Sequence, residues 1–187
     1  VFMDEVRIPH ENVLGEVNGG WACTLTTLAN ERGLIAGANK SSDAVALIEL
    51  ARKRGRSSDP VLRQQLVDCW TRQQIQRYLG FRLQTALSKG VPPGPETSVM
   101  KLFAAEYLRR LGDASLELLG PEGMLLDDAA PAGTEWQARF LYAPSIRIAG
   151  GSNEVQRNIM AERVLGLPGE LRTDRDVPFR EIGKSAS

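Results

Sequence analysis

The chain has 187 residues, of which 42% are hydrophobic, so it is long enough to bury the core of one globular domain. Its 23 Lys and Arg residues balance its 23 Asp and Glu residues, which leaves no basic field of the kind that binds nucleic acid. Two isolated cysteines, Cys23 and Cys69, and one histidine, His10, are too few for a zinc site or a cysteine–histidine catalytic pair.

No apolar run approaches the roughly 20 residues that span a bilayer, and the N-terminus lacks the apolar core of a signal peptide. We therefore expect a cytoplasmic protein with free buried thiols, no metal and no membrane partner. Residues 1–9 have the composition of a strand, yet the chain offers that strand no visible partner. This predicts that the chain is a fragment of a longer protein.

The first half of the chain predicts two long helices. Apolar residues at steps of three and four run from Trp21 to Ala51, with Gly37 as a candidate kink, and the pattern stops in the cationic run 52–56. The second helix begins with Asp59 as N-cap and Pro60 at the first helical position, and it ends near residue 90.

The proline-rich connector 91–95 precedes a third helix, which Thr97 or Ser98 caps and which ends at Gly120. Its expected inward positions are Val99, Phe103, Tyr107, Leu111, Ala114 and Leu118. Residues 122–147 show no sustained period, so we expect an irregular packed segment there. Its expected anchors are Phe140, Leu141 and Tyr142.

A fourth helix follows the glycine pair 150–151. Ser152 or Asn153 is its N-cap, and Gln156 stands three residues after Asn153 as in a capping box. The expected buried stripe is Val155, Ile159 and Val164. Free N–H groups at such a turn can receive an anion, although a simple entry from loop to helix explains the same residues.

Three long helices and a shorter one, joined by short connectors, predict an all-α fold: an up-down four-helix bundle with a short N-terminal extended segment. The bundle is expected over residues 18–168. Residues 1–17 form the extended segment and linker, and residues 169–187 form a polar tail.

The run 150–168 resembles the C-terminal signature of the acyl-CoA dehydrogenases, a family of FAD-dependent flavoproteins. Residues 1–9 and 12–15 are similar to the passage from that family's middle β-domain to its C-terminal helices, and the runs 28–32 and 118–123 stand in the expected order. The resemblance covers essentially the whole chain and independently implies the same helical fold.

The resemblance implies the C-terminal domain of an enzyme of lipid degradation that oxidises an acyl-CoA to the 2,3-enoyl-CoA. It also implies FAD as cofactor, electron-transfer flavoprotein or another electron acceptor as partner, and a homo- or hetero-oligomer, dimeric or tetrameric. The isolated fragment is expected to be inactive. A related flavin oxidase or monooxygenase with the same bundle is an alternative, because fold does not fix chemistry.

Glu31 is the candidate catalytic base. Spacing alone places its carboxylate beside the apolar stripe, where a structural salt bridge is the simpler interpretation. In many members of the family the base precedes the glycine turn, and Gly150 occupies that position here. In a second branch the base lies in the first long helix directly before an arginine, which matches Glu31 and Arg32. Arg32 is then the residue that organises the substrate end of the pocket. Gly150 leaves open a non-catalytic subunit of a mixed oligomer.

The resemblance also assigns cofactor contacts to Gly151, Ser152 and Gln156. Arg54 matches an arginine that reaches the flavin pyrophosphate of a neighbouring subunit, although the surrounding family motif is absent. A solvated cationic helix end explains Arg54 equally well.

Overall fold

The computed structural model describes residues 2–37, 43–92, 94–95, 97–130, 133–169, 177 and 181. Within these residues the regular structure is entirely helical and contains no strand, so the all-α prediction is confirmed. The α-helices are α1 (Gly20–Gly37), α2 (Asp43–Lys53), α3 (Pro60–Ser88), α4 (Thr97–Leu119), α5 (Glu135–Ile146) and α6 (Asn153–Ile159). A π-helical turn, Met160–Val164, continues α6, and short 3-10 helices lie at His10–Asn12, Gly120–Met124 and Asp127–Ala129.

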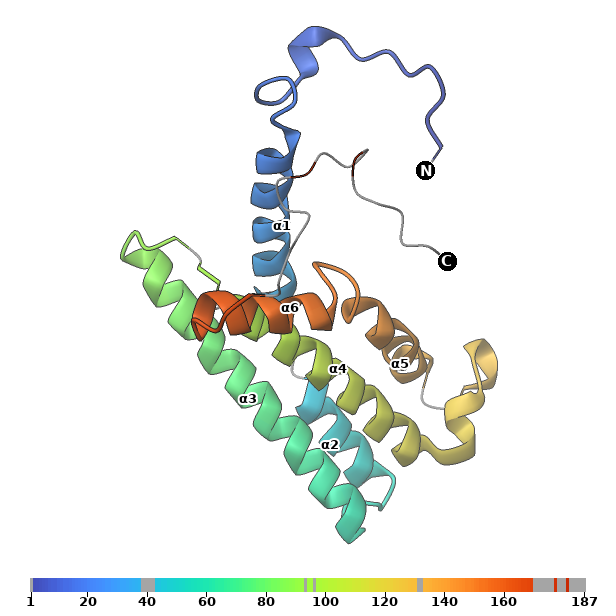
Figure 1. Ribbon diagram of the computed structural model, residues 1–187. Helices are drawn as coiled ribbons and strands as arrows, with labels where there is room; N and C mark the ends of the chain where they lie inside the picture. Colours follow the sequence, from blue (N-terminus) through green and yellow to red (C-terminus); the bar gives the residue numbers. More distant parts are fainter. Residues whose placement is uncertain are drawn as a thin grey trace.

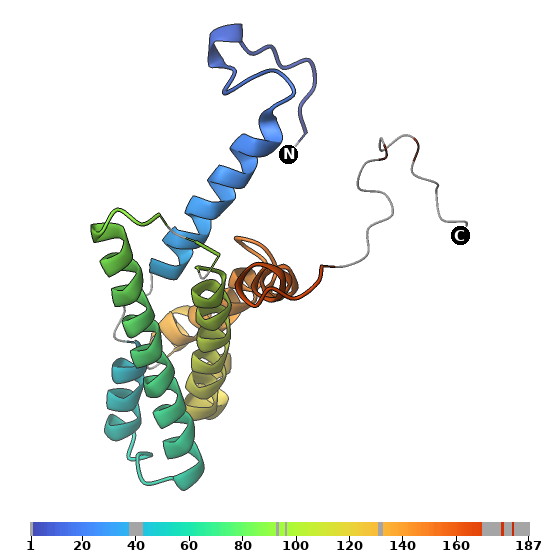
Figure 2. The same cartoon turned by 60° about the vertical axis from the view of Figure 1, so that its left-hand side comes forward.

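Helix α4 is the centre of the molecule, because α1, α2, α3, α5 and α6 all pack against it (Figure 1). The buried core lies between α2, α3, α4 and the start of α5. It consists of Ala44, Leu47, Ala51, Leu62, Leu66, Cys69, Tyr107, Leu111, Ala114, Leu118, Leu119 and Trp136. Helix α1 extends away from these packed helices toward the N-terminal segment, as the rotated view in Figure 2 shows.

The start of α3 follows the predicted capping chemistry. Asp59 Oδ1 accepts hydrogen bonds from the N–H groups of Val61 (3.0 Å) and Leu62 (3.2 Å), and Pro60 occupies the first turn. Helix α3 then runs to Ser88, so both predicted ends are confirmed. Gly37, the expected kink, is the last residue of α1, and residues 38–42 lie outside the described residues.

The expectation of an irregular segment over 122–147 was wrong, because residues 135–146 form α5. Its buried residues are Trp136, Gln137, Ala143 and Ile146, whereas the expected anchors Phe140, Leu141 and Tyr142 are 37%, 66% and 61% exposed. This run of exposed apolar residues obscures the helical period in the sequence. Gly112 brings α5 close to α4, since a Cβ there would lie 3.0 Å from Phe140 Cα.

Candidate functional site

The glycine turn between α5 and α6, residues 147–153, is the first part of the candidate site. Gly150 and Gly151 have φ angles of +65° and +92°, which side-chain-bearing residues rarely adopt. Ser152 is the N-cap of α6, because its Oγ accepts a hydrogen bond from Val155 N at 3.3 Å. The N-cap prediction is therefore confirmed for Ser152 rather than Asn153.

Gln156 is fully buried beneath this turn. Its Nε2 donates to the Gly150 carbonyl at 2.9 Å, while its Oε1 has no hydrogen-bond partner among the described residues. A Cβ on Gly151 would lie 2.5 Å from Gln156 Nε2, so the close approach requires glycine. The space at the missing Cβ of Gly151 is therefore filled by Gln156, and the buried Oε1 is out of reach of a molecule bound outside the turn. Such a molecule could contact the peptide groups of Gly151 and Ser152, whose N–H groups donate to no backbone carbonyl among the described residues.

The predicted apolar stripe of the last helix was wrong. Val155 and Val164 are 49% and 44% exposed, and Ile159 is only half-buried, whereas Asn153 and Gln156 are buried at 1% and 0% exposure. The inward face of α6 is polar because it hydrogen-bonds the turn and α4 instead of packing into the core. Hydrophobic periodicity cannot identify such a face.

Lys101 of α4 binds the buried side of the glycine turn. The sequence analysis did not identify this residue. Its side chain is fully buried, and its Nζ donates to the Gly151 carbonyl at 2.6 Å and to Asn153 Oδ1 at 3.3 Å. Asn153 Nδ2 in turn donates to Glu106 Oε1 at 3.0 Å. Burial lowers the pKa of Lys101 from its ordinary value. The sequence carried no signal that would have identified it, because a lysine within a helix usually keeps its charge in water.

Glu31 and Arg32 lie in the second half of α1. Glu31 is half-buried, and the side chain of Arg32 lies outside the described part of the chain. Helix α1 packs on α4, and both views place its C-terminal end near the N-terminal end of α4 (Figures 1 and 2). No hydrogen bond joins Glu31 to the glycine turn within the described residues. The roles of both residues therefore stay predictions.

Arg54 is not a freely solvated cation. Its Nη2 lies 2.5 Å from Glu122 Oε2, and its side chain is 24% exposed. Arg54 therefore binds the 3-10 helix Gly120–Met124 that follows α4, while Arg56 donates to the Glu117 carbonyl at the C-terminal end of α4 at 3.3 Å. Lys101 and Glu117 are separated by roughly 24 Å along the helix at 1.5 Å per residue. The structure therefore brings Gly151, Ser152 and Gln156 together and places Arg54 far from them.

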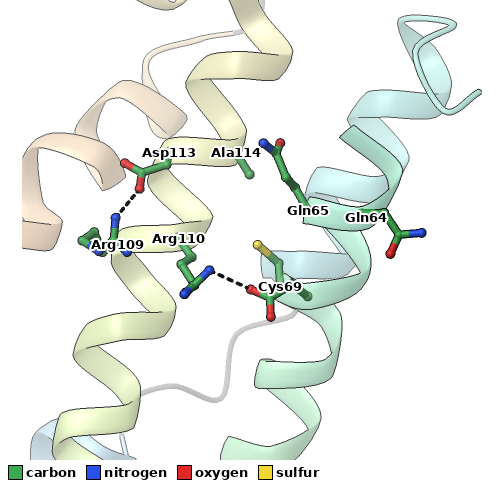
Figure 3. Close-up of a pocket in the computed structure, with 8 residues that line it drawn as sticks. Gln64, Gln65, Cys69, Arg109, Arg110, Asp113 and Ala114 are labelled. Atoms are coloured by element: carbon green, nitrogen blue, oxygen red, sulfur yellow. Dashed lines mark hydrogen bonds and ion pairs between the residues drawn. The ribbon is translucent and has the colours of Figure 1, made fainter. Parts of the chain in front are cut away.

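A separate open pocket of about 380 Å³ lies between α3 and α4 (Figure 3). Its charges are already paired: Arg109 Nη1 lies 2.7 Å from Asp113 Oδ2, and Arg110 Nη1 lies 3.5 Å from Asp68 Oδ2. The wall therefore has no net charge that would select an ion. Within the described residues no cluster of His, Cys, Asp and Glu could hold a metal, and no helix is long and apolar enough to cross a bilayer.

Cys69 lines this pocket but is only 1% exposed, and burial raises the pKa of its thiol to about 11. At pH 8 roughly one thiol in a thousand is then ionised, so we expect Cys69 to be alkylated much more slowly than half-buried Cys23. The Cys69 rate should rise about tenfold per pH unit up to about pH 11. Peptide mass spectrometry after timed alkylation measures both rates, and equal rates at pH 8 would contradict the expectation.

The same shift has a consequence for stability. The folded pKa of Cys69 lies above its ordinary value of 9.0, so its contribution to folding is fully present below pH 9. That contribution is lost as the pH rises from about 9 to about 11.

Comparison with known proteins supports the same domain. The family model described as "Acyl-CoA dehydrogenase, C-terminal domain" matches residues 18–165. The chain is 36% identical over 178 residues to acyl-CoA dehydrogenase IpdE1 of Mycobacterium tuberculosis, covering 92% of this chain and 44% of that protein. It is 32% identical over 169 residues to acyl-CoA dehydrogenase FadE34 of the same organism, covering 90% of this chain and 22% of that protein.

A solved structure titled "Tcur3481-Tcur3483 steroid ACAD" has the same fold. It superimposes with a TM-score of 0.80 at 24% identity, covering 90% of this chain and 45% of that chain. The chain thus spans less than half of the length of these relatives. The match over residues 18–165 and the all-helical fold show that the chain belongs to the acyl-CoA dehydrogenase family, as its C-terminal domain.

Proposed function

We propose that the chain contributes the helical part of an FAD-dependent enzyme that oxidises an acyl-CoA thioester to the 2,3-enoyl-CoA. The observation that carries this proposal is the glycine turn: Gln156 and Lys101 hold the Gly150 and Gly151 carbonyls, and the N–H groups of Gly151 and Ser152 donate to no backbone carbonyl among the described residues. Those N–H groups would be available to acceptor atoms of a flavin placed against the turn. FAD, when bound, supplies the acceptor for the hydride that leaves the β-carbon.

Individual residues of this chain would have separate roles in binding the cofactor, removing the proton and binding the substrate. The N–H groups of Gly151 and Ser152 would face the ring, and Gln156 would hold the turn in place from its buried side through the Gly150 carbonyl. Glu31 removes the α-proton, which requires a carboxylate within hydrogen-bond reach of that carbon. Arg32 organises the substrate end of the pocket.

Arg54 would serve a different flavin. It lies at the opposite end of α4 from the glycine turn, so one compact ring site cannot contain both. This separation supports an oligomer, homo- or hetero-oligomeric, in which Arg54 reaches the pyrophosphate of a neighbouring subunit's FAD. An incoming phosphate would have to compete with Glu122 for the guanidinium group.

A second candidate function is a non-catalytic subunit of a mixed oligomer. Gly150 favours it, because this buried position carries no carboxylate beside the turn. In that case Glu31 is structural, and the base comes from a partner subunit.

Anaerobic reduction of the purified full-length protein tests these alternatives. We expect at least one member of a panel of straight-chain, branched and steroid-derived acyl-CoA thioesters to bleach the visible flavin band. The steroid-derived compound is included because one solved neighbour is titled a steroid ACAD. Electron-transfer flavoprotein or another electron acceptor should then reoxidise the flavin.

Bound flavin that no thioester reduces, with or without a partner subunit, would contradict the proposal. Reoxidation by oxygen at the rate of turnover would instead favour a flavin oxidase or monooxygenase. Reduction that appears only after a second subunit is added would favour the non-catalytic role.

A further inference from the structure

Lys101 is a fully buried lysine on α4. Its exposure is 0%, and its hydrogen bonds go to a backbone carbonyl and an amide oxygen rather than to a carboxylate. A fully buried lysine without such a partner is rare, because its charge loses the solvation of water. Core packing does not need this charge, since an apolar side chain of similar length would fill the same space.

The hydrogen bonds of Lys101 and Gln156 fix two successive peptide groups of the turn. Gln156 holds the Gly150 carbonyl, and Lys101 holds the Gly151 carbonyl. Both peptide groups are trans, so the N–H on each points away from its carbonyl. The N–H groups of Gly151 and Ser152 are therefore directed away from Gln156 and Lys101. In the part of the chain that the structure describes, neither donates to another backbone carbonyl.

Asn153 completes the arrangement by joining two residues of α4. Its Oδ1 accepts from Lys101 at 3.3 Å, and its Nδ2 donates to Glu106 at 3.0 Å, which fixes the orientation of the amide. Glu106 also lies 3.8 Å from Arg147 Nε, at the beginning of the turn. Helix α4 thus holds both ends of the turn, and Figure 1 shows α6 beside it.

We propose that Lys101 is a positioning residue for the flavin: its buried ammonium group orients the glycine turn and places a positive charge behind it. This inference rests on the proposed function, because it is the proposed flavin that lies against the turn. A fixed positive charge stabilises the extra negative charge of a reduced ring, so Lys101 should raise the reduction potential of the bound cofactor.

The test compares Lys101→Met with Lys89→Met in the full-length protein. Lys89 is an exposed lysine at the C-terminal end of α3, so the control makes the same chemical change away from the turn. For Lys101→Met we expect FAD to bind at least tenfold more weakly. We also expect the variant to bind reduced flavin in preference to oxidised flavin tenfold less strongly than the wild type does. This corresponds to a fall of about 30 mV in the two-electron reduction potential of the bound FAD. The Lys89→Met control should match the wild type in its affinity for FAD and in the reduction potential of the bound FAD.

A second measurement does not depend on flavin. Hydrogen exchange of the cofactor-free protein follows the amides of Asn153, Val155 and Gln156, whose acceptors are Arg147 and Ser152. Lys101→Met should exchange them at least tenfold faster than the control does. If Lys101→Met does not fold, Lys101→Gln replaces it, because an amide keeps a donor but loses the charge; the same fall in potential is then expected.

The outcomes separate this inference from the proposed function. A wild type that takes up no FAD defeats the proposed function, and the exchange rates then decide whether Lys101 holds the turn. A wild type that binds FAD, with a Lys101 variant of unchanged potential and unchanged exchange, overturns the positioning role and leaves the proposed function standing.

Discussion

Replacement of Glu31 by glutamine in the full-length protein is expected, under the proposed function, to lower the rate of flavin reduction by acyl-CoA by about 10² to 10⁴, the usual contribution of a general base. The amide cannot accept the α-proton but has nearly the same shape, so FAD should stay bound. Glu31 is half-buried on α1, the helix whose C-terminal end approaches the N-terminal end of α4 (Figure 1). Anaerobic stopped-flow measurement of flavin bleaching gives the rate directly.

Glu49→Gln is a suitable control for this variant. Glu49 is an exposed carboxylate on α2 that pairs with Arg52, and its replacement should leave the rate unchanged. Near-normal reduction by the Glu31→Gln protein would remove Glu31 from the mechanism and favour a base on a partner subunit.

The second large effect is expected for Gly151→Ala. The φ angle of +92° disfavours alanine, and its Cβ would stand 2.5 Å from Gln156 Nε2. Gln156 is fully buried and bonded to Gly150, so it cannot move aside without losing that bond. We expect strain of about 1–3 kcal/mol in folding free energy and loss of stoichiometric FAD. Chemical denaturation and flavin content measure the two effects.

Gly166→Ala separates backbone strain from the collision. Gly166 has a φ angle of +68°, yet a Cβ there would meet no heavy atom within 4 Å. This variant should be destabilised by backbone strain alone and should retain its flavin. Equal flavin loss in both variants would show that the contact with Gln156 is unimportant.

The residues that end and begin helices were the most predictable part of the fold. Asp59 and Pro60 specify the start of α3 through local chemistry, which needs no knowledge of the rest of the molecule. Helix α5 was missed because its buried residues are few and its exposed apolar residues interrupt the period. Exposure depends on the tertiary arrangement, which the one-dimensional pattern does not contain.

The candidate site was predictable only in part. The family resemblance selected Gly151, Ser152 and Gln156, which are neighbours in the chain at the start of α6, and their cofactor contacts stay a prediction. Lys101 carried no motif, because a lysine in a helix is usually solvated and its burial follows from where α6 crosses α4. Glu31 was selected on resemblance and spacing, and its proximity to the turn stays a prediction.

The inverted polarity of α6 changes how sequence variation in this domain should be interpreted. In most helices of globular proteins the apolar positions resist substitution and the polar positions accept it. Here Asn153 and Gln156 face inward and Val155 faces outward. Methods that rank substitutions by hydropathy would therefore misjudge this helix. They would pass an asparagine-to-serine change that removes the bridge from Asn153 to α4, and would flag a valine-to-threonine change at Val155 that leaves every hydrogen bond of the turn in place.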